Sequence, residues 1–315
     1  MKVINGKYIV RKMVDITNKS TTLRTAVAQA VVKVSKQETI TAIENDTVPK
    51  GNVFAMSKAA GLLGVKRTPD ILPDCHPLPI EFTGIEYKVD GLEITVLFTV
   101  KTIYKTGVEV EAMHGASVVA LNMYDMLKPI DKGIEIHAIK LLKKKGGKSD
   151  FKDTFRKDLT AAVVVCSDTI SAGHKEDKAG KAIISKLESC GVKISEYVII
   201  PDEVEDIQQK ARTYQEQGID MVIYTGGTGL SGRDVTPEAL LPILDRRIPR
   251  IEEAIRSYGQ ERIPFAMLSR SIAGTIGNTL VLALPGSTNG AKESMDAIFP
   301  AVLHSFRILK GARHD

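Results

Sequence analysis

The stretch from Met221 to Glu238, MVIYTGGTGLSGRDVTPE, decides how the second half of this chain folds. Its first residues form an apolar run that is typical of a buried strand. Thr236-Pro237-Glu238 is typical of a helix start, because it joins an N-cap hydroxyl, a proline in the first turn and an acid. The four glycines between them let the backbone turn sharply and present N–H groups to an anion. We therefore predict a loop that holds a phosphorylated ligand, with Asp234 available for a metal ion or a reacting group.

The rest of the second half alternates strand-like and helical patterns. Apolar, strand-like runs occupy residues 161–166, 197–200, 221–224 and 279–284. Helical patterns occupy residues 178–190, 203–217, 237–245, 249–258 and 289–309. This alternation is typical of a mostly parallel sheet covered by helices, so we expect an α/β three-layer domain.

Hydroxyls, acids and glycines follow four of these strands: Ser167-Asp168, Pro201-Asp202, the Thr225–Asp234 loop and Pro285-Gly286-Ser287. In open α/β sheets, ligands bind outside the carboxyl ends of the strands, so we expect a site at that edge. A glycine-rich turn without a ligand is the alternative interpretation of the loop. The loop is not a P-loop, because Gly-x-x-x-x-Gly-Lys-Ser/Thr is missing from it.

Length and composition favour a two-domain soluble protein. The chain has 315 residues, of which 43% are apolar and 26% are charged. It has no apolar run long enough to span a bilayer and no signal-peptide core at its start, so we expect a cytoplasmic protein without a membrane partner. The net charge of +5 comes without a nucleic-acid motif, and we expect no nucleic-acid partner. The three cysteines show neither a disulfide framework nor zinc-site spacing: Cys75, Cys166 and Cys190.

The polar, glycine-bearing segment 143–153 separates two halves with different patterns. We read its exposed part as a solvated connector and place the boundary at 155/156, giving domains 1–155 and 156–315. In the first half, residues 25–34 and 92–103 are rich in β-formers, and Asp90-Gly91 after 86–89 is a hairpin signal. Helices are indicated at 52–63 and 108–127. We expect an α+β ferredoxin-like domain.

The predicted helix 108–127 carries a polar stripe of Glu111, His114, Asn122 and Asp125 among apolar and small residues. A buried stripe of this kind needs partners or a ligand, unless the helix simply turns its polar side to water. Glu111 and Asp125 are fourteen residues apart, which is about 21 Å along a straight helix. That is too far for one reacting centre, so the helix must start after Glu111 or neighbouring subunits must share the site. We expect sharing, in a homo-oligomer such as a trimer or hexamer.

Residues from about Met13 to Phe151 resemble the MoaC family, the cyclic pyranopterin monophosphate synthases. The shared motifs are Met-Val-Asp, Lys-Arg-Thr, Cys-His-Pro-Leu, Thr-Gly-Val-Glu-x-Glu-Ala, Tyr-Asp-Met-x-Lys and Gly-Gly-Lys-Ser. The resemblance implies a lyase that converts (8S)-3′,8-cyclo-7,8-dihydroguanosine 5′-triphosphate into cyclic pyranopterin monophosphate and pyrophosphate. The sequence departs from the pattern at Asp74, where an apolar residue is usual, and at His114-Gly115, where Leu-Thr-like residues are usual.

Carried over position by position, Asp125 and Lys128 match the catalytic pair, which suits proton transfer during the ring rearrangement. Lysines suit the charge of a triphosphate and of the departing pyrophosphate. The further positions expected to act in catalysis are Lys50, Lys66 and His76. The expected substrate contacts are Asp74, Cys75, His76, Glu109, Val110 and Glu111. From the residues alone, a lone loop histidine such as His76 is more often structural or solvated.

The Tyr224–Glu238 stretch resembles the signature loop of the MoaB/MogA family, and the likeness covers roughly residues 159–310. It implies adenylylation of molybdopterin with Mg-ATP. Asp202 and Asp234 match the acids needed for that transfer, and we expect them to coordinate Mg²⁺ and position the attacking phosphate. The residues expected to cradle the pterin and its phosphate are Thr225, Gly226, Gly227, Thr228, Gly229, Ser269, Arg270, Pro285, Gly286 and Ser287.

Two alternatives stay open at this point. In one of them, the second domain is a non-catalytic molybdopterin-binding or oligomerisation module. In the other, both domains are inactive and sense nucleotides. We expect no tightly bound organic cofactor in either half.

Overall fold

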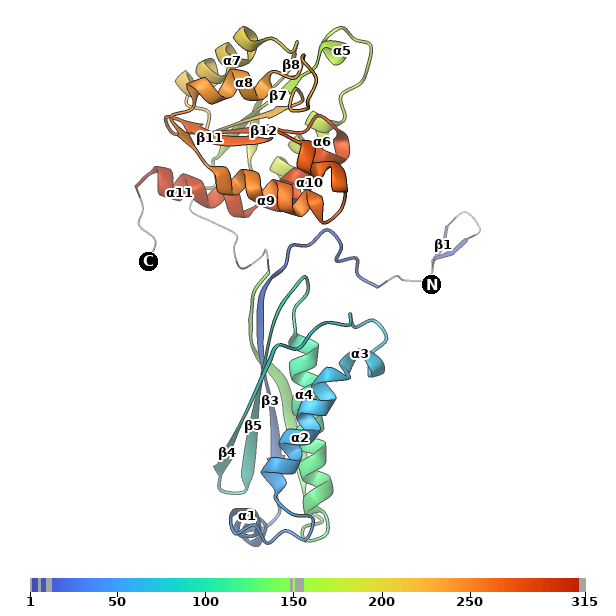
Figure 1. The fold of residues 1–315 in the computed structure, drawn as a ribbon. Helices are drawn as coiled ribbons and strands as arrows, with labels where there is room; N and C mark the ends of the chain where they lie inside the picture. The colour runs from blue at the N-terminus through green and yellow to red at the C-terminus, as the bar shows by residue number, and fades with distance from the viewer. Residues whose placement is uncertain (1, 5–6, 10–12, 148–149, 151–155, 312–315) are drawn as a thin grey trace. The chain divides into compact units, whose positions relative to one another are not determined.

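The computed structural model describes residues 2–4, 7–9, 13–147, 150 and 156–311. The chain divides into two compact units, Met1–Asp150 and Phe151–Asp315, each with its own sheet and core (Figure 1). The boundary predicted at 155/156 borders residues 151–155, which lie outside the described residues, and it stays a prediction. Among the helices of the described residues, none is long and apolar enough to cross a membrane.

The first unit is built on a four-stranded antiparallel sheet with the strand order β4-β5-β3-β6. Its strands are β3 (Thr22–Lys33), β4 (Phe82–Asp90), β5 (Glu93–Tyr104) and β6 (Glu135–Lys145). Its helices are α1 (Gln37–Glu44), α2 (Val53–Lys66), α3 (Thr68–Ile71) and α4 (Glu109–Leu127). Helices α2 and α4 cover one face of the sheet (Figure 1). A short antiparallel pair, β1 (Lys2–Ile4) and β2 (Lys7–Ile9), precedes the sheet.

The core of the first unit lies between this sheet and helices α2 and α4. Every second residue of β3 and β5 is fully buried, as a strand with one covered face requires: Ala26, Ala28, Ala30, Val32, Ile94, Val96, Phe98 and Val100. The helices come close to the Phe98 ring because both carry a glycine there. A Cβ at Gly61 would lie 2.9 Å from the ring, and one at Gly115 would be closer still.

The second unit is built on a six-stranded mixed sheet with the order β10-β11-β12-β9-β7-β8. Strands β12, β9, β7 and β8 run parallel, and β11 joins β12 and β10 antiparallel. The strands are β7 (Thr160–Cys166), β8 (Lys193–Ile200), β9 (Met221–Thr225), β10 (Arg246–Arg247), β11 (Ile272–Ile276) and β12 (Thr279–Leu284).

Helices cover both faces of this sheet, so the unit has three layers (Figure 1). The α-helices are α5 (Asp168–Ser171), α6 (Ala179–Ser189), α7 (Val204–Glu216), α8 (Thr236–Leu240), α9 (Pro249–Gln260), α10 (Thr288–Ile298) and α11 (Ser305–Leu309). Three 3-10 turns cover Leu241–Ile243, Pro264–Leu268 and Ala301–His304. In β9, Met221 and Ile223 pack toward α6, α9 and α10, whereas Val222 and Tyr224 pack toward α7 and α8. A strand buried on both sides is the reason for the unbroken apolar run in the sequence.

Most predicted elements are present, and three expectations are wrong. The pattern 289–309 is not one helix, because α10 ends at Ile298 just before Pro300 and α11 starts at Ser305. The pattern 237–245 holds only the five-residue α8 and a 3-10 turn with Pro242. Residues 143–145 are not a connector, because β6 continues to Lys145. Strands β6, β10 and β11 were not expected from the sequence.

The contact between Gly115 and Phe98 gives a stability prediction. Replacing a helical glycine with alanine normally stabilises a helix by about 1 kcal/mol. In Gly115→Ala the new methyl group meets the Phe98 ring, so we expect a net loss of about 1–3 kcal/mol. Amide hydrogen exchange in α4 and β5 measures the free energy of opening of this unit alone.

Phe98→Leu provides the matched background. Removing the ring frees the space, so Gly115→Ala made in Phe98→Leu should become neutral or stabilising. An equal loss in both backgrounds would mean that the ring does not require the glycine.

Candidate functional sites

The first unit has a cleft of about 860 Å³ at the start of α4. All six residues expected to contact the substrate line it: Asp74, Cys75, His76, Glu109, Val110 and Glu111. The cleft is also lined by cationic side chains and a glycine pair that sequence reasoning did not place in a site: Lys19, Arg24, Lys105, Lys144, Gly146 and Gly147. Positive charge at a cleft wall suits a polyphosphate ligand.

Arg24 shows how the sheet places this charge. It comes from β3 and is nearly buried, and its guanidinium donates to the carbonyls of Tyr104 at 3.1 Å and Lys105 at 3.2 Å. The strand end therefore holds a fixed cation beside the turn into α4. Lys144 on β6 forms an ion pair with Glu109 at the start of the same helix. The signal available in the sequence was an arginine in phase with the alanines of an alternating strand.

Glu111 and Cys75 form the buried side of the cleft. Glu111 is 2% exposed, and its Oε1 accepts a hydrogen bond from the Cys75 thiol at 3.0 Å. Burial raises the pKa of Glu111. Burial also raises the pKa of Cys75, to about 12, with a further contribution from Glu111. At neutral pH Cys75 is therefore a thiol that donates a hydrogen bond, and it is not a thiolate nucleophile.

His76 anchors the neighbouring loop. Its Nε2–H donates to the carbonyl of Val14 at 2.7 Å, which joins the Cys-His-Pro loop to the Met13–Ile16 segment. The Gly-Gly-Lys-Ser motif reaches the cleft through Gly146 and Gly147, whereas Lys148 and Ser149 lie outside the described residues.

A second cluster lies at the other end of α4 and does not line this cleft. The Asp125 carboxylate is held by Lys50 at 2.6 Å and by Lys128 at 2.7 Å. The hydrogen bonds from Lys128 and Lys50 lower the pKa of Asp125 to about 2, and the same bond raises the pKa of Lys128. At neutral pH Lys128 is therefore a protonated ammonium that pairs with the Asp125 carboxylate. The remaining expected lysine, Lys66, is exposed at the end of α2.

Helix α4 is continuous from Glu109 to Leu127, so it contains both Glu111 and Asp125. The alternative that this helix starts after Glu111 is wrong. The two carboxylates belong to separate clusters of one protomer, about 21 Å apart along the helix axis.

Part of the polar stripe of α4 is satisfied by the protein itself. Nδ1 of His114 lies 3.0 Å from the Thr68 hydroxyl, and Asn122 donates to the Ser57 hydroxyl at 3.1 Å. These residues have structural partners in or beside α2. The residues of the stripe that remain candidates for catalysis are therefore Glu111 and Asp125, at its two ends.

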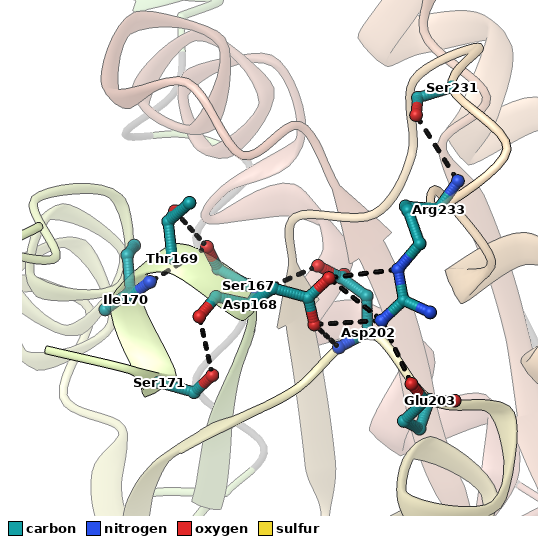
Figure 2. A network of polar contacts seen from close by, with 9 residues as sticks. All are labelled: Ser167, Asp168, Thr169, Ile170, Ser171, Asp202, Glu203, Ser231 and Arg233. Atoms are coloured by element: carbon teal, nitrogen blue, oxygen red, sulfur yellow. Dashed lines mark hydrogen bonds and ion pairs between the residues drawn. The ribbon is translucent and has the colours of Figure 1, made fainter. Parts of the chain in front are cut away.

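In the second unit, acids from two strand ends are tied together (Figure 2). Asp168 follows β7 and Asp202 follows β8, and the backbone N–H of each donates to the carboxylate of the other at 3.1 Å. Arg233, from the loop after β9, donates from Nε and Nη2 to the two oxygens of Asp168, both at 3.0 Å. Its Nη2 also donates to Glu203 at 2.9 Å. Three strand ends thus meet at one edge, as the sequence predicted.

The expected metal ligands, Asp202 and Asp234, lie in this region. Burial raises the pKa of Asp202, and the charges of Asp168 and Asp234 add to that rise. Oδ1 of Asp202 is buried without a hydrogen-bond partner within the described part of the chain. Oδ2 of Asp234 accepts from the backbone N–H of Ser231 at 2.8 Å.

The signature loop needs its glycines. Gly226 has φ +105°, and a Cβ there would collide with the carbonyl of Cys166. Gly227 has φ +60°, and a Cβ there would lie 2.9 Å from Oδ1 of Asp202. The glycines therefore let the loop backbone pass directly over the strand ends. Thr225 and Thr236 fasten it by hydrogen bonds to the carbonyls of Pro285 at 2.8 Å and Gly226 at 3.0 Å.

Arg270 braces the loop from its other side. Its guanidinium donates to the carbonyls of Gly229 at 2.8 Å and Asp234 at 2.6 Å and pairs with Glu238, while its backbone N–H donates to Thr228 at 3.0 Å. These contacts position the loop, and they use the hydrogen-bond donors of the Arg270 guanidinium. A neighbouring cavity of about 420 Å³ is lined by the expected residues Ser269, Pro285 and Ser287.

Ser287 is also the N-cap of the eleven-residue α10, and its hydroxyl accepts from Gly290 at 3.2 Å. A Cβ at Gly286 would lie 3.0 Å from Cα of Gly226, so this turn packs against the loop. The expected cradle residues thus adjoin one another.

The donor set fits a Mg²⁺ that also binds ligand phosphates. Mg²⁺ is usually held by one or two carboxylates, with the remaining positions taken by water and phosphate oxygens. Oδ1 of Asp202 is free to serve as one ligand and Asp234 as another. Over the residues that the structure describes, no group of three or more His, Cys, Asp or Glu side chains could hold a metal by itself.

Sequence reasoning did not assign roles to Asp168, Glu203 or Arg233. Ser167-Asp168 stood out as a strand-end pair, but its partner lies 65 residues further along the chain. A bidentate pair of this kind leaves no spacing pattern in the sequence.

Two family models match the chain, one in each unit. Residues 13–147 match the MoaC family, and residues 162–304 match a probable molybdopterin binding domain. A cyclic pyranopterin monophosphate synthase of Geotalea uraniireducens is 48% identical over 139 residues, which are 44% of this chain and 86% of that protein. The solved structure of the molybdopterin biosynthesis enzyme MoaB from Thermus thermophilus is 35% identical and covers 50% of this chain and 99% of its own, with a TM-score of 0.47.

One relative matches both units together. The molybdenum cofactor biosynthesis bifunctional protein of Chlorobaculum tepidum is 39% identical over 303 residues, which cover 96% of each chain. With both units matched in one relative, this chain belongs to the family of molybdenum cofactor biosynthesis bifunctional proteins.

Proposed function

We propose that this chain is a two-site enzyme of molybdenum cofactor biosynthesis. Its first unit converts (8S)-3′,8-cyclo-7,8-dihydroguanosine 5′-triphosphate into cyclic pyranopterin monophosphate and pyrophosphate. Its second unit binds molybdopterin and adenylylates it with Mg-ATP. The observation that carries the proposal is that each family match falls on one compact unit, which has its own cluster of acids and anion-accepting groups. Small pterins and nucleotides are the substrates.

The order of elements supports a ferredoxin-like arrangement of the first unit. Its main elements follow as strand, helix, strand, strand, helix, strand, and its sheet has the order β4-β5-β3-β6. This arrangement places the start of α4 beside the turn that leaves β5, where the cleft lies.

In the synthase unit, the cationic cleft wall binds the triphosphate and compensates the charge of the leaving pyrophosphate. Cys75 and the buried Glu111 shape the floor of the cleft. Lys128, protonated and oriented by Asp125, supplies a proton during the rearrangement. Lys50 holds the other side of Asp125 and so fixes the pair.

A homo-oligomer completes this site. One α4 cannot bring Glu111 and Asp125 to the same substrate, because about 21 Å separates them. The edge strand β6 also supports a second copy: Ile139 and Leu142 on it are 40% and 46% exposed. An exposed apolar edge strand needs a cover. A trimer or hexamer provides neighbouring copies.

In the second unit, Asp202 and Asp234 would hold Mg²⁺, which would supply Lewis-acid stabilisation of the phosphate charge. The loop from Thr225 to Gly229 and the turn Pro285–Ser287 contact the pterin and its phosphate. Arg270 keeps the loop in place. The competing function is a molybdopterin-binding module without catalysis.

Substitutions in the two clusters should separate the two reactions. Asp125→Asn or Lys128→Ala should abolish formation of cyclic pyranopterin monophosphate and leave adenylylation unchanged. Asp234→Asn should have the opposite effect. Mass spectrometry of the products from each substrate measures both, and Lys132→Ala, an exposed lysine near the cluster, is the control. Loss of both reactions from one change in a folded protein would contradict two independent sites.

Mixing two inactive variants tests the shared site. Glu111→Gln and Asp125→Asn should each abolish synthase activity alone. After subunit exchange, random pairing should restore up to about a quarter of the activity, because each intact shared site needs the right half from both variants. No recovery in mixed oligomers verified by native mass spectrometry would mean that the site is not shared.

The second unit is tested with molybdopterin and Mg-ATP. We expect an adenylylated product from the unchanged protein and none from Asp202→Ala, since that change removes a cation ligand. If the unchanged protein forms no product and Asp202→Ala binds molybdopterin equally well, the binding-module function is correct.

A further inference from the structure

Arg233 forms a clasp between three segments of the second unit. Its guanidinium holds both oxygens of Asp168, which follows β7, and one oxygen of Glu203, which precedes α7 (Figure 2). Arg233 itself belongs to the signature loop after β9. A planar guanidinium that grips a carboxylate with two parallel bonds fixes orientation as well as distance. The loop is therefore tied to the ends of two other parallel strands.

The clasp also fixes Asp234, the next residue in the chain. Residues 231–234 form a closed turn: the N–H of Asp234 donates to the Ser231 carbonyl at 3.0 Å, and the N–H of Ser231 donates back to Asp234 Oδ2 at 2.8 Å. The Ser231 hydroxyl accepts from the N–H of Arg233 at 3.3 Å. Because this turn is internally bonded, holding Arg233 also holds the Asp234 carboxylate.

Asp202 is fixed from the same point. Its backbone N–H and its Oδ2 both bond to Asp168, which leaves Oδ1 buried and without a partner among the residues described. Asp168 thus links the two expected cation ligands: directly to Asp202, and through Arg233 to Asp234. The opposite side of the loop is held separately by Arg270.

We propose that Arg233, acting through Asp168, is a positioning residue that sets Asp202 and Asp234 at the spacing needed to share one divalent cation. This rests on the proposed function of the second unit. In this proposal the clasp acts on the cation ligands and touches neither cation nor substrate. Since the side chains of Arg233 and Asp168 are 57% and 43% exposed, the pair contributes little to folding stability. Its contribution is to the geometry of the site.

The change in cation affinity of an Arg233 variant distinguishes this positioning role from simple charge neutralisation. Removing a positive charge beside a cation site strengthens cation binding when electrostatics alone decides. Removing a clasp that fixes the ligands weakens it. Loss of a partner that orients a metal ligand typically costs about ten- to hundredfold in metal affinity. Arg233→Met therefore gives opposite results under the two explanations.

Isothermal titration calorimetry of the full chain with Mn²⁺ alone is the experiment. We expect the unchanged protein to bind Mn²⁺, Asp202→Asn to abolish that binding, and Arg233→Met to weaken it about ten- to hundredfold. Arg233→Lys keeps the charge without the two-pronged grip, so it should also weaken binding. Arg250→Met is the matched control, because the Arg250 side chain is 90% exposed and forms a surface ion pair with Glu253.

A double variant tests whether Arg233 acts through Asp168. Asp168→Asn should weaken Mn²⁺ binding by itself, and adding Arg233→Met to it should cause no further loss. Three results would each overturn the proposal. Arg233→Met could bind Mn²⁺ as tightly as the unchanged protein or more tightly, or the double variant could lose more affinity than Asp168→Asn alone. The third is that the unchanged protein shows no Mn²⁺ binding that depends on Asp202. Clasp-dependent Mn²⁺ binding without any adenylylated product would refute the proposed transfer reaction and leave the clasp standing.

Discussion

The unbroken helix α4 is the constraint on which the synthase unit depends. It packs tightly on the Phe98 ring through Gly115, so it behaves as a rigid rod fixed to the sheet. Its first turn carries the buried Glu111 of the cationic cleft, and its last turn carries the Asp125–Lys128 pair. A rod of this length cannot fold its two ends onto one small substrate. In the proposed oligomer, a second copy supplies the missing end of the site.

In the second unit, the main constraint is that several acids lie close together at one edge of the sheet. Parallel strands deliver Asp168, Asp202 and Asp234 close together, and like charges in that arrangement oppose one another. Backbone N–H groups and Arg233 compensate Asp168, whose pKa is lowered mainly by the backbone bond from Asp202 and then by Arg233. Asp202 receives less compensation, and burial raises its pKa. The uncompensated charge remains where a cation would bind.

The sequence predicted what local patterns encode. Runs such as 221–224 and 279–284 showed the parallel strands, because strands covered on both faces are apolar throughout. Strand β6 was missed because its lysines resemble a solvated connector, whereas in the structure they lie on an exposed edge strand. The cleft residues 74–76 and 109–111 were found through shared motifs. Arg24 and Arg233 were not, since Arg24 bonds the Tyr104 carbonyl 80 residues away and Arg233 grips Asp168 65 residues away.

The product of the first proposed reaction, cyclic pyranopterin monophosphate, is not the substrate of the second, molybdopterin, so direct transfer of an intermediate is a weak reason for the fusion. Each unit has its own core and its own cluster of acids. A single chain does fix the ratio of the two units at one to one. If the first unit must associate to complete its site, every such assembly also gathers several copies of the second unit. We therefore propose co-expression and shared assembly, rather than channelling, as the reason for the fusion.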